Sequence, residues 1–211
     1  CLHIPALLHR QHIRRYSDSD LSFLKNDEIF HATIEVSHFG NAVLDSTKTT
    51  YTIRDEYGKI YYKEISNNRT IPVGNCIQLG EVNYPLASIT SPAKLNLEVC
   101  IEGTHFANDW DFWVYPAVVE TNQGNVYITD TFNEKALETL ASGGNVLITA
   151  ARKITYGQGI VQQFTPVFWN TSWFKMRPPH TTGIWVNNNH PLFKNFPTEY
   201  HSNLQWWELL N

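Results

Sequence analysis

Hydrophobic and polar residues alternate along much of the first half of the chain. Between Phe30 and Val36 the even-numbered positions are apolar and the odd-numbered positions are polar. The same period of two recurs at 50–54 and at 94–101. Such alternation is typical of β-strands with one face on a core and the other in water. Turn-forming residues separate these runs at 55–58, 66–68, 72–75 and 90–92. The pattern predicts an antiparallel β-sandwich.

After Pro116 the pattern changes to that of alternating strand and helix. An apolar run at 125–129 precedes Thr131 and Glu134, which have the spacing of a helix-capping box. Apolar residues then recur at helical spacing as far as Gly143-Gly144, which can end a helix, and a second apolar run occupies 146–150. Strand, helix and strand predict a parallel βαβ unit. We therefore expect an α+β chain, in which a small or incomplete doubly wound α/β domain follows the sandwich.

These patterns divide the chain into three predicted regions. Residues 1–25 are expected to be an N-terminal extension or a linker from a preceding domain, 26–116 the sandwich, and 117–211 the α/β domain. Beyond residue 151 the chain is rich in aromatic residues and prolines, which limit regular structure. The apolar run at 206–210 leads us to expect that the α/β domain continues past Asn211.

Charge and hydropathy narrow the choice of partners. The formal net charge is −4, and the one basic cluster, at 9–15, is short and followed at once by acidic residues. Nucleic acid binding needs a clustered basic surface, so we expect no nucleic acid partner. Apolar runs stay well below the roughly 20 residues needed to cross a bilayer, so we expect no membrane span.

The cysteines and histidines do not have metal-ligand spacing. Cysteines occur without a C-x-x-C pair, which argues against a zinc ribbon or a thioredoxin motif. Cys76 and Cys100 either pair across neighbouring strands or are small buried hydrophobic residues. The histidines His180, His190 and His201 are irregularly spaced, and we expect loop hydrogen bonds rather than zinc. The sequence therefore predicts neither a metal site nor a cofactor.

The segment 107–116 is the most chemically suggestive part of the chain, because it combines carboxylates with large aromatic residues. Asp109 and Asp111 have the spacing that places both on one face of a strand, and a glycosidase needs two carboxyl groups beside the scissile bond. The competing interpretation is a domain junction made by Asp109, Trp110, Asp111 and Trp113. We favour the junction, since the chain offers no TIM-barrel frame for an acid and a nucleophile. It predicts rigidly docked domains, with Trp110 and Trp113 buried between them.

Other catalytic chemistries lack their motifs. The Gly143-Gly144 pair follows the predicted helix, which is the wrong side for a phosphate cradle, and no G-x-G-x-x-G follows a strand. No cysteine follows Cys100, and no G-x-S-x-G is present, which removes the usual Cys and Ser nucleophiles from the second half.

Several stretches resemble the region that follows the catalytic barrel in large bacterial enzymes of glycoside hydrolase family 2, the β-galactosidase type, many of them from gut Bacteroidetes. The most specific are Ala107–Pro116 and Phe196–Trp207, supported by Asn26–Phe30, Ile71–Gly74 and Ala93–Leu95. The resemblance covers nearly the whole chain. It implies an immunoglobulin-like sandwich joined to a flavodoxin-like domain of the class I amidotransferase type that lacks its cysteine.

The same resemblance implies a supporting role. The family's catalytic glutamates lie in the barrel, so no catalytic residue can be assigned to this chain. It implies a non-catalytic accessory region that packs on the barrel of the same polypeptide or builds an oligomer, in a periplasmic or extracellular bacterial protein.

An alternative function is carbohydrate binding. The chain contains 7 Trp and 10 Tyr, and aromatic faces can stack on sugar rings. The candidate residues are Trp110, Trp113, Trp173 and Trp185, with an oligosaccharide as the partner. Exposure of these rings distinguishes the two functions, since buried aromatics are structural.

Overall fold

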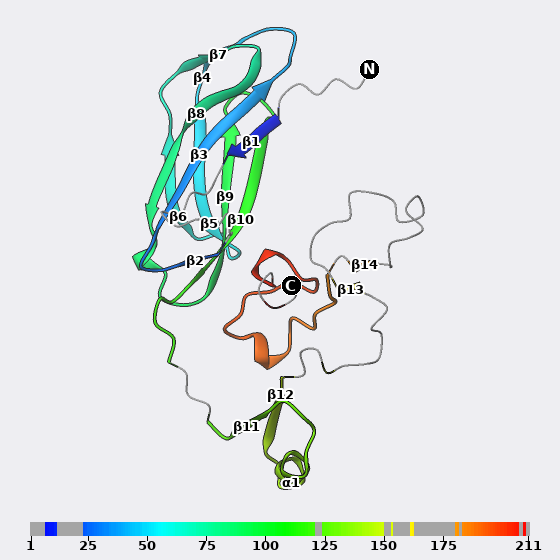
Figure 1. Ribbon diagram of the computed structural model, residues 1–211. Helices are drawn as coiled ribbons and strands as arrows, with labels where there is room; N and C mark the ends of the chain where they lie inside the picture. The colour runs from blue at the N-terminus through cyan, green and yellow to red at the C-terminus, as the bar shows by residue number, and fades with distance from the viewer. Residues whose placement is uncertain are drawn as a thin grey trace. The chain divides into compact units, whose positions relative to one another are not determined.

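The structure is a computed structural model, and it describes residues 7–11, 23–120, 124–149, 153, 161–162, 180–181, 183–206 and 209. It is mostly β-sheet, with one α-helix in that part of the chain (Figure 1). The chain divides into two compact units. Unit 1 comprises Cys1–Ala117 and Trp185–Trp207, and unit 2 comprises Val118–Ile184 and Glu208–Asn211.

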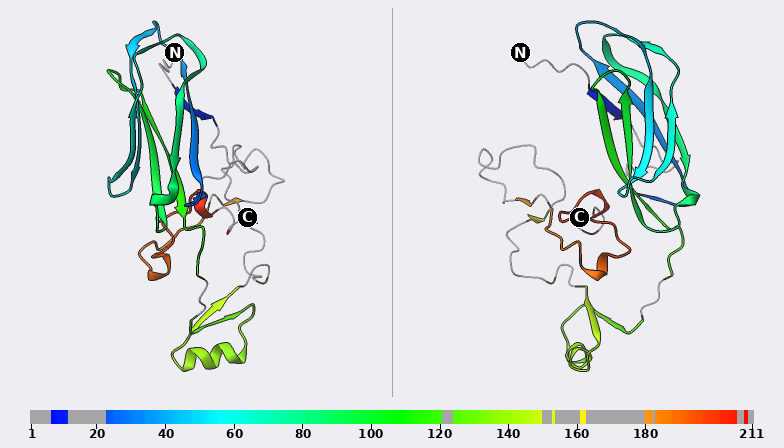
Figure 2. Two further views of the ribbon diagram at one scale, coloured as in Figure 1. Left: turned by 90° about the vertical axis from the view of Figure 1, so that its left-hand side faces the viewer. Right: turned by 180° about the vertical axis from the view of Figure 1, so that it is seen from behind.

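The strands of unit 1 form two main sheets that lie face to face (Figure 2). The smaller sheet has the order β1-β3-β8 and the larger the order β2-β10-β9-β5-β6, while β4 pairs with β7. The strands are β1 (Leu7–Gln11), β2 (Phe23–Lys25), β3 (Ile29–His38), β4 (Leu44–Thr47), β5 (Thr49–Asp55), β6 (Ile60–Ile65), β7 (Arg69–Ile71), β8 (Gly74–Pro85), β9 (Ala93–Ile101) and β10 (Ala107–Tyr115). A short 3-10 helix, η1 (Leu86–Ser88), follows β8.

The core of unit 1 contains the apolar positions that alternate in the sequence. Phe30 and Ile34 on β3, and Leu95 and Leu97 on β9, have exposed fractions of 0%. Phe30 stacks on Phe112 of β10, with ring centroids 4.2 Å apart, so this pair joins the two sheets. The predicted strands at 30–36, 50–54 and 94–101 are therefore confirmed, as is the face that each one buries.

Two strands lie in the stretch 1–25 that the sequence predicts to be an extension or linker. β1 pairs antiparallel with β3, and β2 pairs parallel with β10. The other strand pairs of unit 1 are antiparallel, so β2 departs from the predicted all-antiparallel arrangement. Three residues are too short for a readable period, and only their pairing with the distant β10 makes them a strand.

Gly80 lies on β8 where the core leaves no room for a side chain. A Cβ atom at this position would lie 2.8 Å from the Tyr51 hydroxyl oxygen, and Tyr51 is 2% exposed. We expect Gly80→Ala to lower the free energy of unfolding by about 1–3 kcal/mol, as overpacked core sites do. Denaturant unfolding measures the loss. Tyr51→Phe removes the hydroxyl oxygen, and the nearest ring atom, Cζ, would then lie 3.4 Å from the added Cβ. In that background Gly80→Ala should therefore lower the free energy of unfolding by less. An equal cost in both backgrounds would contradict this explanation.

Unit 2 contains the predicted βαβ unit. β11 (Val126–Thr129) and β12 (Asn145–Ile148) pair in parallel, and the helix α1 (Glu134–Ala141) connects them. Two further short strands, β13 (Val161–Gln162) and β14 (His180–Thr181), also pair in parallel. Gly143 has a φ of +80°, in the left-handed region that the predicted helix end requires.

The predicted capping box at Thr131 and Glu134 is wrong. Asn133 is the N-cap residue, because its side chain accepts a 3.0 Å hydrogen bond from the Ala136 amide, and the helix begins at Glu134. The Thr131 carbonyl instead accepts a hydrogen bond from the Asn133 amide. Asn is as good an N-cap residue as Thr, and it lies nearer the first apolar helical position.

The last part of unit 1, which we name the aromatic segment, runs from Trp185 to Trp206. It contains two 3-10 helices, η2 (Pro191–Phe193) and η3 (Leu204–Trp206). Three of its rings pack together, with centroids 5.0 Å apart for Phe196 and Trp206 and 5.7 Å apart for Phe193 and Trp206. The Trp206 indole nitrogen donates a 2.8 Å hydrogen bond to the Thr198 hydroxyl. Aromatic packing therefore holds a segment whose prolines exclude long helices and strands.

Candidate functional site

β10 places Asp109 and Asp111 on the face of the larger sheet that points away from the core. The two residues pair in register with Glu98 and Asn96 of β9. Phe112 and Val114 of the same strand are buried in the core. Since successive side chains of a strand alternate between faces, both carboxylates lie on the outer face, as their spacing predicts.

Neighbouring side chains bind both carboxylates. The Asn96 side-chain amide donates to an oxygen of Asp109 at 2.7 Å and to an oxygen of Asp111 at 2.9 Å. The Lys94 ammonium nitrogen lies 2.8 Å from the other oxygen of Asp111. Lys94 also forms an ion pair with Glu199 of the aromatic segment. Lys94, Asn96, Asp109, Asp111 and Glu199 form what we name the outer-face cluster.

The outer-face cluster keeps Lys94 charged. Partial burial alone would lower the pKa of its ammonium group, but hydrogen bonds and charge attraction from Asp111 and Glu199 outweigh burial and raise that pKa. In the cluster, Asp111 has a partner at both carboxylate oxygens, and Asp109 and Glu199 each have a partner at one.

Trp110 and Trp113 lie on opposite faces of β10. Trp110 is half-buried and packs against the core, opposite Leu97. Trp113 is 1% exposed on the outer face, and the Lys94 nitrogen lies 5.9 Å from its ring centroid. The two rings cannot share one stacking platform, and buried Trp113 offers no face to a sugar. Burial of Trp113 therefore argues against sugar binding at that residue, and for Trp110 sugar binding stays a prediction.

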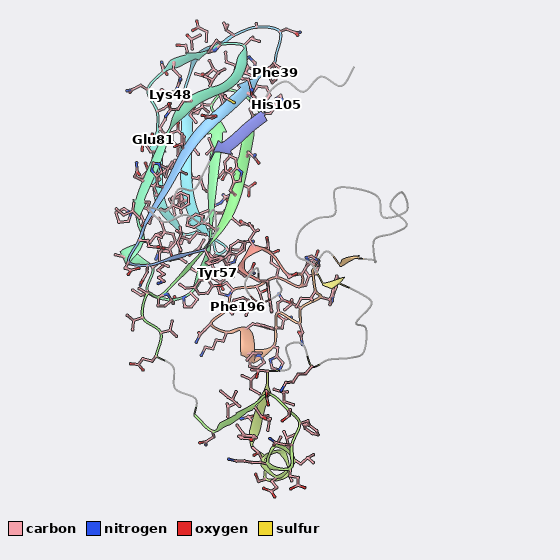
Figure 3. All side chains as sticks on the ribbon, in the orientation of Figure 1. Phe39, Lys48, Tyr57, Glu81, His105 and Phe196 are labelled. Carbon is pink, nitrogen blue, oxygen red and sulfur yellow. The ribbon has the colours of Figure 1, made fainter. Side chains whose placement is uncertain are left out.

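The aromatic segment docks on the sandwich beside Trp113. The rings of Tyr115 on β10 and Phe196 stack with centroids 6.2 Å apart, and Glu199 binds Lys94, the residue opposite Trp113 (Figure 3 labels Phe196). Asp109, Trp110, Asp111 and Trp113 therefore lie within unit 1 and its docked segment. Rigid docking between the two units stays a prediction.

Sequence reasoning missed Lys94, Asn96 and Glu199. Lys94 and Asn96 occupy polar positions in an alternating strand, and Glu199 lies 105 residues after Lys94. The one available signal was the position of Lys94 and Asn96 on the same strand face, two residues apart. Their pairing with β10 depends on a register that the sequence alone does not fix.

Tyr115 should make unit 1 sensitive to alkaline pH. Its hydroxyl has no hydrogen-bond partner among the described residues, and burial raises its pKa from 10.0 to about 12. Burial, with the hydrogen bond to Glu64, raises the pKa of Tyr62 to about 12 as well. A raised tyrosine pKa stabilises the fold fully below the unfolded pKa, and that stability is lost as pH rises through the folded pKa.

We therefore expect the melting temperature to hold up to about pH 10 and to fall between about pH 10 and 12. Tyr115→Phe cannot ionise, so it should flatten part of this fall. Thermal melts of both proteins across pH 8 to 12 measure the effect. Parallel curves for the two would contradict the assignment of Tyr115.

The described residues hold no group of three or more His, Cys, Asp or Glu that could bind a metal. The His190 ring nitrogen accepts a 3.1 Å hydrogen bond from the Leu192 amide at the start of η2. His201 forms an isolated β-bridge with Trp185. The His190 contact is the loop hydrogen bond that the sequence predicts, whereas His201 takes part in backbone pairing and His180 lies in β14.

Cys76 and Cys100 are not paired. Cys76 is exposed with a φ of +52°, and Cys100 is half-buried on β9. The predicted alternatives, a disulfide or two buried cysteines, are both wrong for Cys76. Burial, followed by the nearby Glu98, raises the pKa of the Cys100 thiol, which makes it a poor nucleophile at neutral pH.

Trp185 is the predicted sugar-binding residue that offers an exposed ring. It is 79% exposed, and its ring centroid lies 5.0 Å from that of Tyr200, which is 59% exposed. The rings are tilted by 58°. Trp173 lies outside the described residues.

In the part of the chain that the structure describes, no helix is long and apolar enough to cross a membrane.

Two family models match the chain. Residues 28–116 match a domain of unknown function, DUF8488, and residues 127–211 match another, DUF8487. No curated protein matches the chain.

Three solved structures similar to the chain are of glycoside hydrolases. The Parabacteroides merdae β-glucuronidase is 13% identical, over 42% of this chain and 12% of that chain, with a TM-score of 0.32. The same enzyme with glycerol in its active site is 12% identical, over 53% and 13%, with a TM-score of 0.34. A family 123 glycoside hydrolase from Clostridium perfringens is 9% identical, over 65% and 35%, with a TM-score of 0.35. The chain thus spans about a third or less of the length of these proteins.

Proposed function

We propose that the chain is a non-catalytic accessory region of a glycan-degrading glycoside hydrolase, in which it supports the catalytic barrel, domain packing or oligomer formation. The observation that carries the proposal is that neighbouring side chains bind the carboxylates of Asp109 and Asp111. These are the carboxylates best placed by the sequence for glycosidase chemistry, and Asn96 binds both of them, while Lys94 also binds Asp111.

Glycosidase chemistry asks something different of its carboxyl groups. One must give a proton to the leaving oxygen, and the other must attack the sugar or activate water. Asp111 is bound by an ammonium group and an amide donor, and Asp109 by the same amide donor, so the oxygens that make these contacts are less free for either task. The arrangement therefore supports a structural role for the segment that carries both acids.

The proposed architecture is an immunoglobulin-like sandwich at 26–116 joined to an amidotransferase-like α/β domain at 117–211. The parallel βαβ unit of β11, α1 and β12 supports an α/β fold for the second region. The sequence lacks a cysteine after Cys100, so this region cannot use the nucleophile of a class I amidotransferase.

The partner that we propose is the catalytic barrel of the same polypeptide, in a periplasmic or extracellular bacterial enzyme. The complete reading frame tests this, because we expect a barrel with two catalytic glutamates directly before this region. Deleting the 211 residues from that enzyme should lower its melting temperature or change its oligomeric state. A reading frame without a hydrolase barrel would remove the proposal.

A further inference from the structure

Trp185 and Tyr200 form an exposed aromatic pair whose backbone is fixed. The Val186 amide donates a 2.7 Å hydrogen bond to the Tyr200 carbonyl, and Trp185 bridges His201. Val186 is 5% exposed, so the backbone next to Trp185 is anchored inward. The rings nevertheless remain 79% and 59% exposed, with centroids 5.0 Å apart. Exposed large aromatics that occur together, on a fixed backbone, indicate a binding surface more often than single ones do.

The chain around Trp185 is uncharged, whereas Glu199, next to Tyr200, forms an ion pair with Lys94. The stretch 184–193 contains no Asp, Glu, Lys or Arg. Asn187, Asn188 and Asn189 follow Trp185 closely, and all three are exposed. Each asparagine amide can both donate and accept hydrogen bonds. A hydrogen bond of 3.0 Å from the His190 amide to the Asn187 carbonyl closes the turn that carries them.

We propose that the aromatic pair and the neighbouring asparagine turn bind a neutral saccharide. A pyranose ring presents an apolar C–H face that can stack on an aromatic ring, and hydroxyl groups that amides can bind. The absence of charged residues in 184–193 favours a neutral sugar over a uronic acid or a phosphate ester. This proposal goes beyond the accessory role, and either can fail without the other.

Titration calorimetry on the full 211-residue chain tests the proposal, with cellohexaose, xylohexaose and mannohexaose as probes and an oligogalacturonate as the acidic comparison. We expect at least one neutral hexasaccharide to bind with a Kd of about 1 mM or tighter, and the acidic one to bind more weakly. Trp185→Ala should weaken binding about tenfold or more. Trp185→Phe, which keeps an aromatic face, should retain most of it.

Phe39→Ala is the matched control, because Phe39 is an exposed aromatic residue at 54% in the loop after β3, and it should leave binding unchanged (Figure 3). Since Trp185 and Tyr200 are exposed, their variants should melt within a few degrees of the unmodified chain.

Failure of all three neutral probes to bind would overturn the proposal. So would unchanged binding in the Trp185→Ala/Tyr200→Ala double variant. A chain that self-associates through Trp185, shown by light scattering on both proteins, would make the pair a protein interface and also overturn it.

Discussion

Trp113→Ala will lower the free energy of unfolding of unit 1 by about 3–5 kcal/mol, the usual cost of truncating a buried tryptophan. Trp113 is 1% exposed on the outer face of β10, where its neighbours Tyr115 and Lys94 contact the aromatic segment. Truncation to alanine would therefore leave a large cavity on that face. Trp113→Phe should cost less, because the indole nitrogen has no hydrogen-bond partner among the described residues. Denaturant unfolding followed by circular dichroism measures the differences.

The matched control is Trp185→Ala, the same substitution at a residue that is 79% exposed. It should change the free energy of unfolding by no more than about 0.5 kcal/mol. Equal effects at the two positions would contradict the structural role of Trp113. The junction hypothesis adds that both units melt in a single transition, and two separate transitions in the unmodified chain would count against it.

Phe112→Ala will destabilise unit 1 by a similar amount, about 3–5 kcal/mol. Phe112 is fully buried, and its ring stacks on Phe30 of the other sheet at a centroid distance of 4.2 Å with an angle of 23° between the ring planes. Phe112→Leu keeps most of the volume and should cost distinctly less. Unfolding of Phe112→Ala, Phe30→Ala and the double variant gives the coupling between the rings.

That coupling should be at least about 0.5–1.5 kcal/mol, the value for aromatic pairs beyond their buried area. Additive effects would show that the two rings are independently buried and do not hold the sheets together. The two predictions test opposite faces of β10. Phe112→Ala tests the packing between the two sheets, and Trp113→Ala tests the outer face, where the aromatic segment docks.

The sequence was most informative where burial follows a local period. Alternation at Phe30–Val36 and at 94–101 predicted both the strands and their buried faces, since each strand has one face on the core. The change of period after Pro116 predicted the βαβ unit. The spacing of Asp109 and Asp111 correctly placed them on one face.

The sequence was least informative where distant segments meet. β2 pairs with β10 across about 90 residues, and Glu199 reaches Lys94 across 105, so neither contact leaves a local pattern. The role of Trp113 depended on the aromatic segment, whose prolines and irregular backbone carry no period. Trp110 and Trp113 were grouped by proximity in sequence, although three residues along a strand place side chains on opposite faces.

The start of α1 shows that sequence-based prediction can also fail over a few adjacent residues. Thr131 and Asn133 both suit an N-cap position, and the capping-box spacing to Glu134 favoured Thr131. In the structure Asn133 is the N-cap residue, because it lies directly before Glu134 and its side chain accepts a hydrogen bond from the Ala136 amide. Element boundaries depend on such competition between adjacent residues, whereas the existence of the element does not.

Turnover of aryl glycosides by the purified 211-residue chain tests the central claim, that its carboxylates are structural, most directly. A panel of aryl β-galactosides, β-glucuronides and N-acetylhexosaminides should show no release of the aryl group above the rate in buffer. Asp109→Asn and Asp111→Asn should lower the melting temperature without changing that background. Turnover comparable to that of a whole glycosidase, abolished by either substitution, would contradict the account.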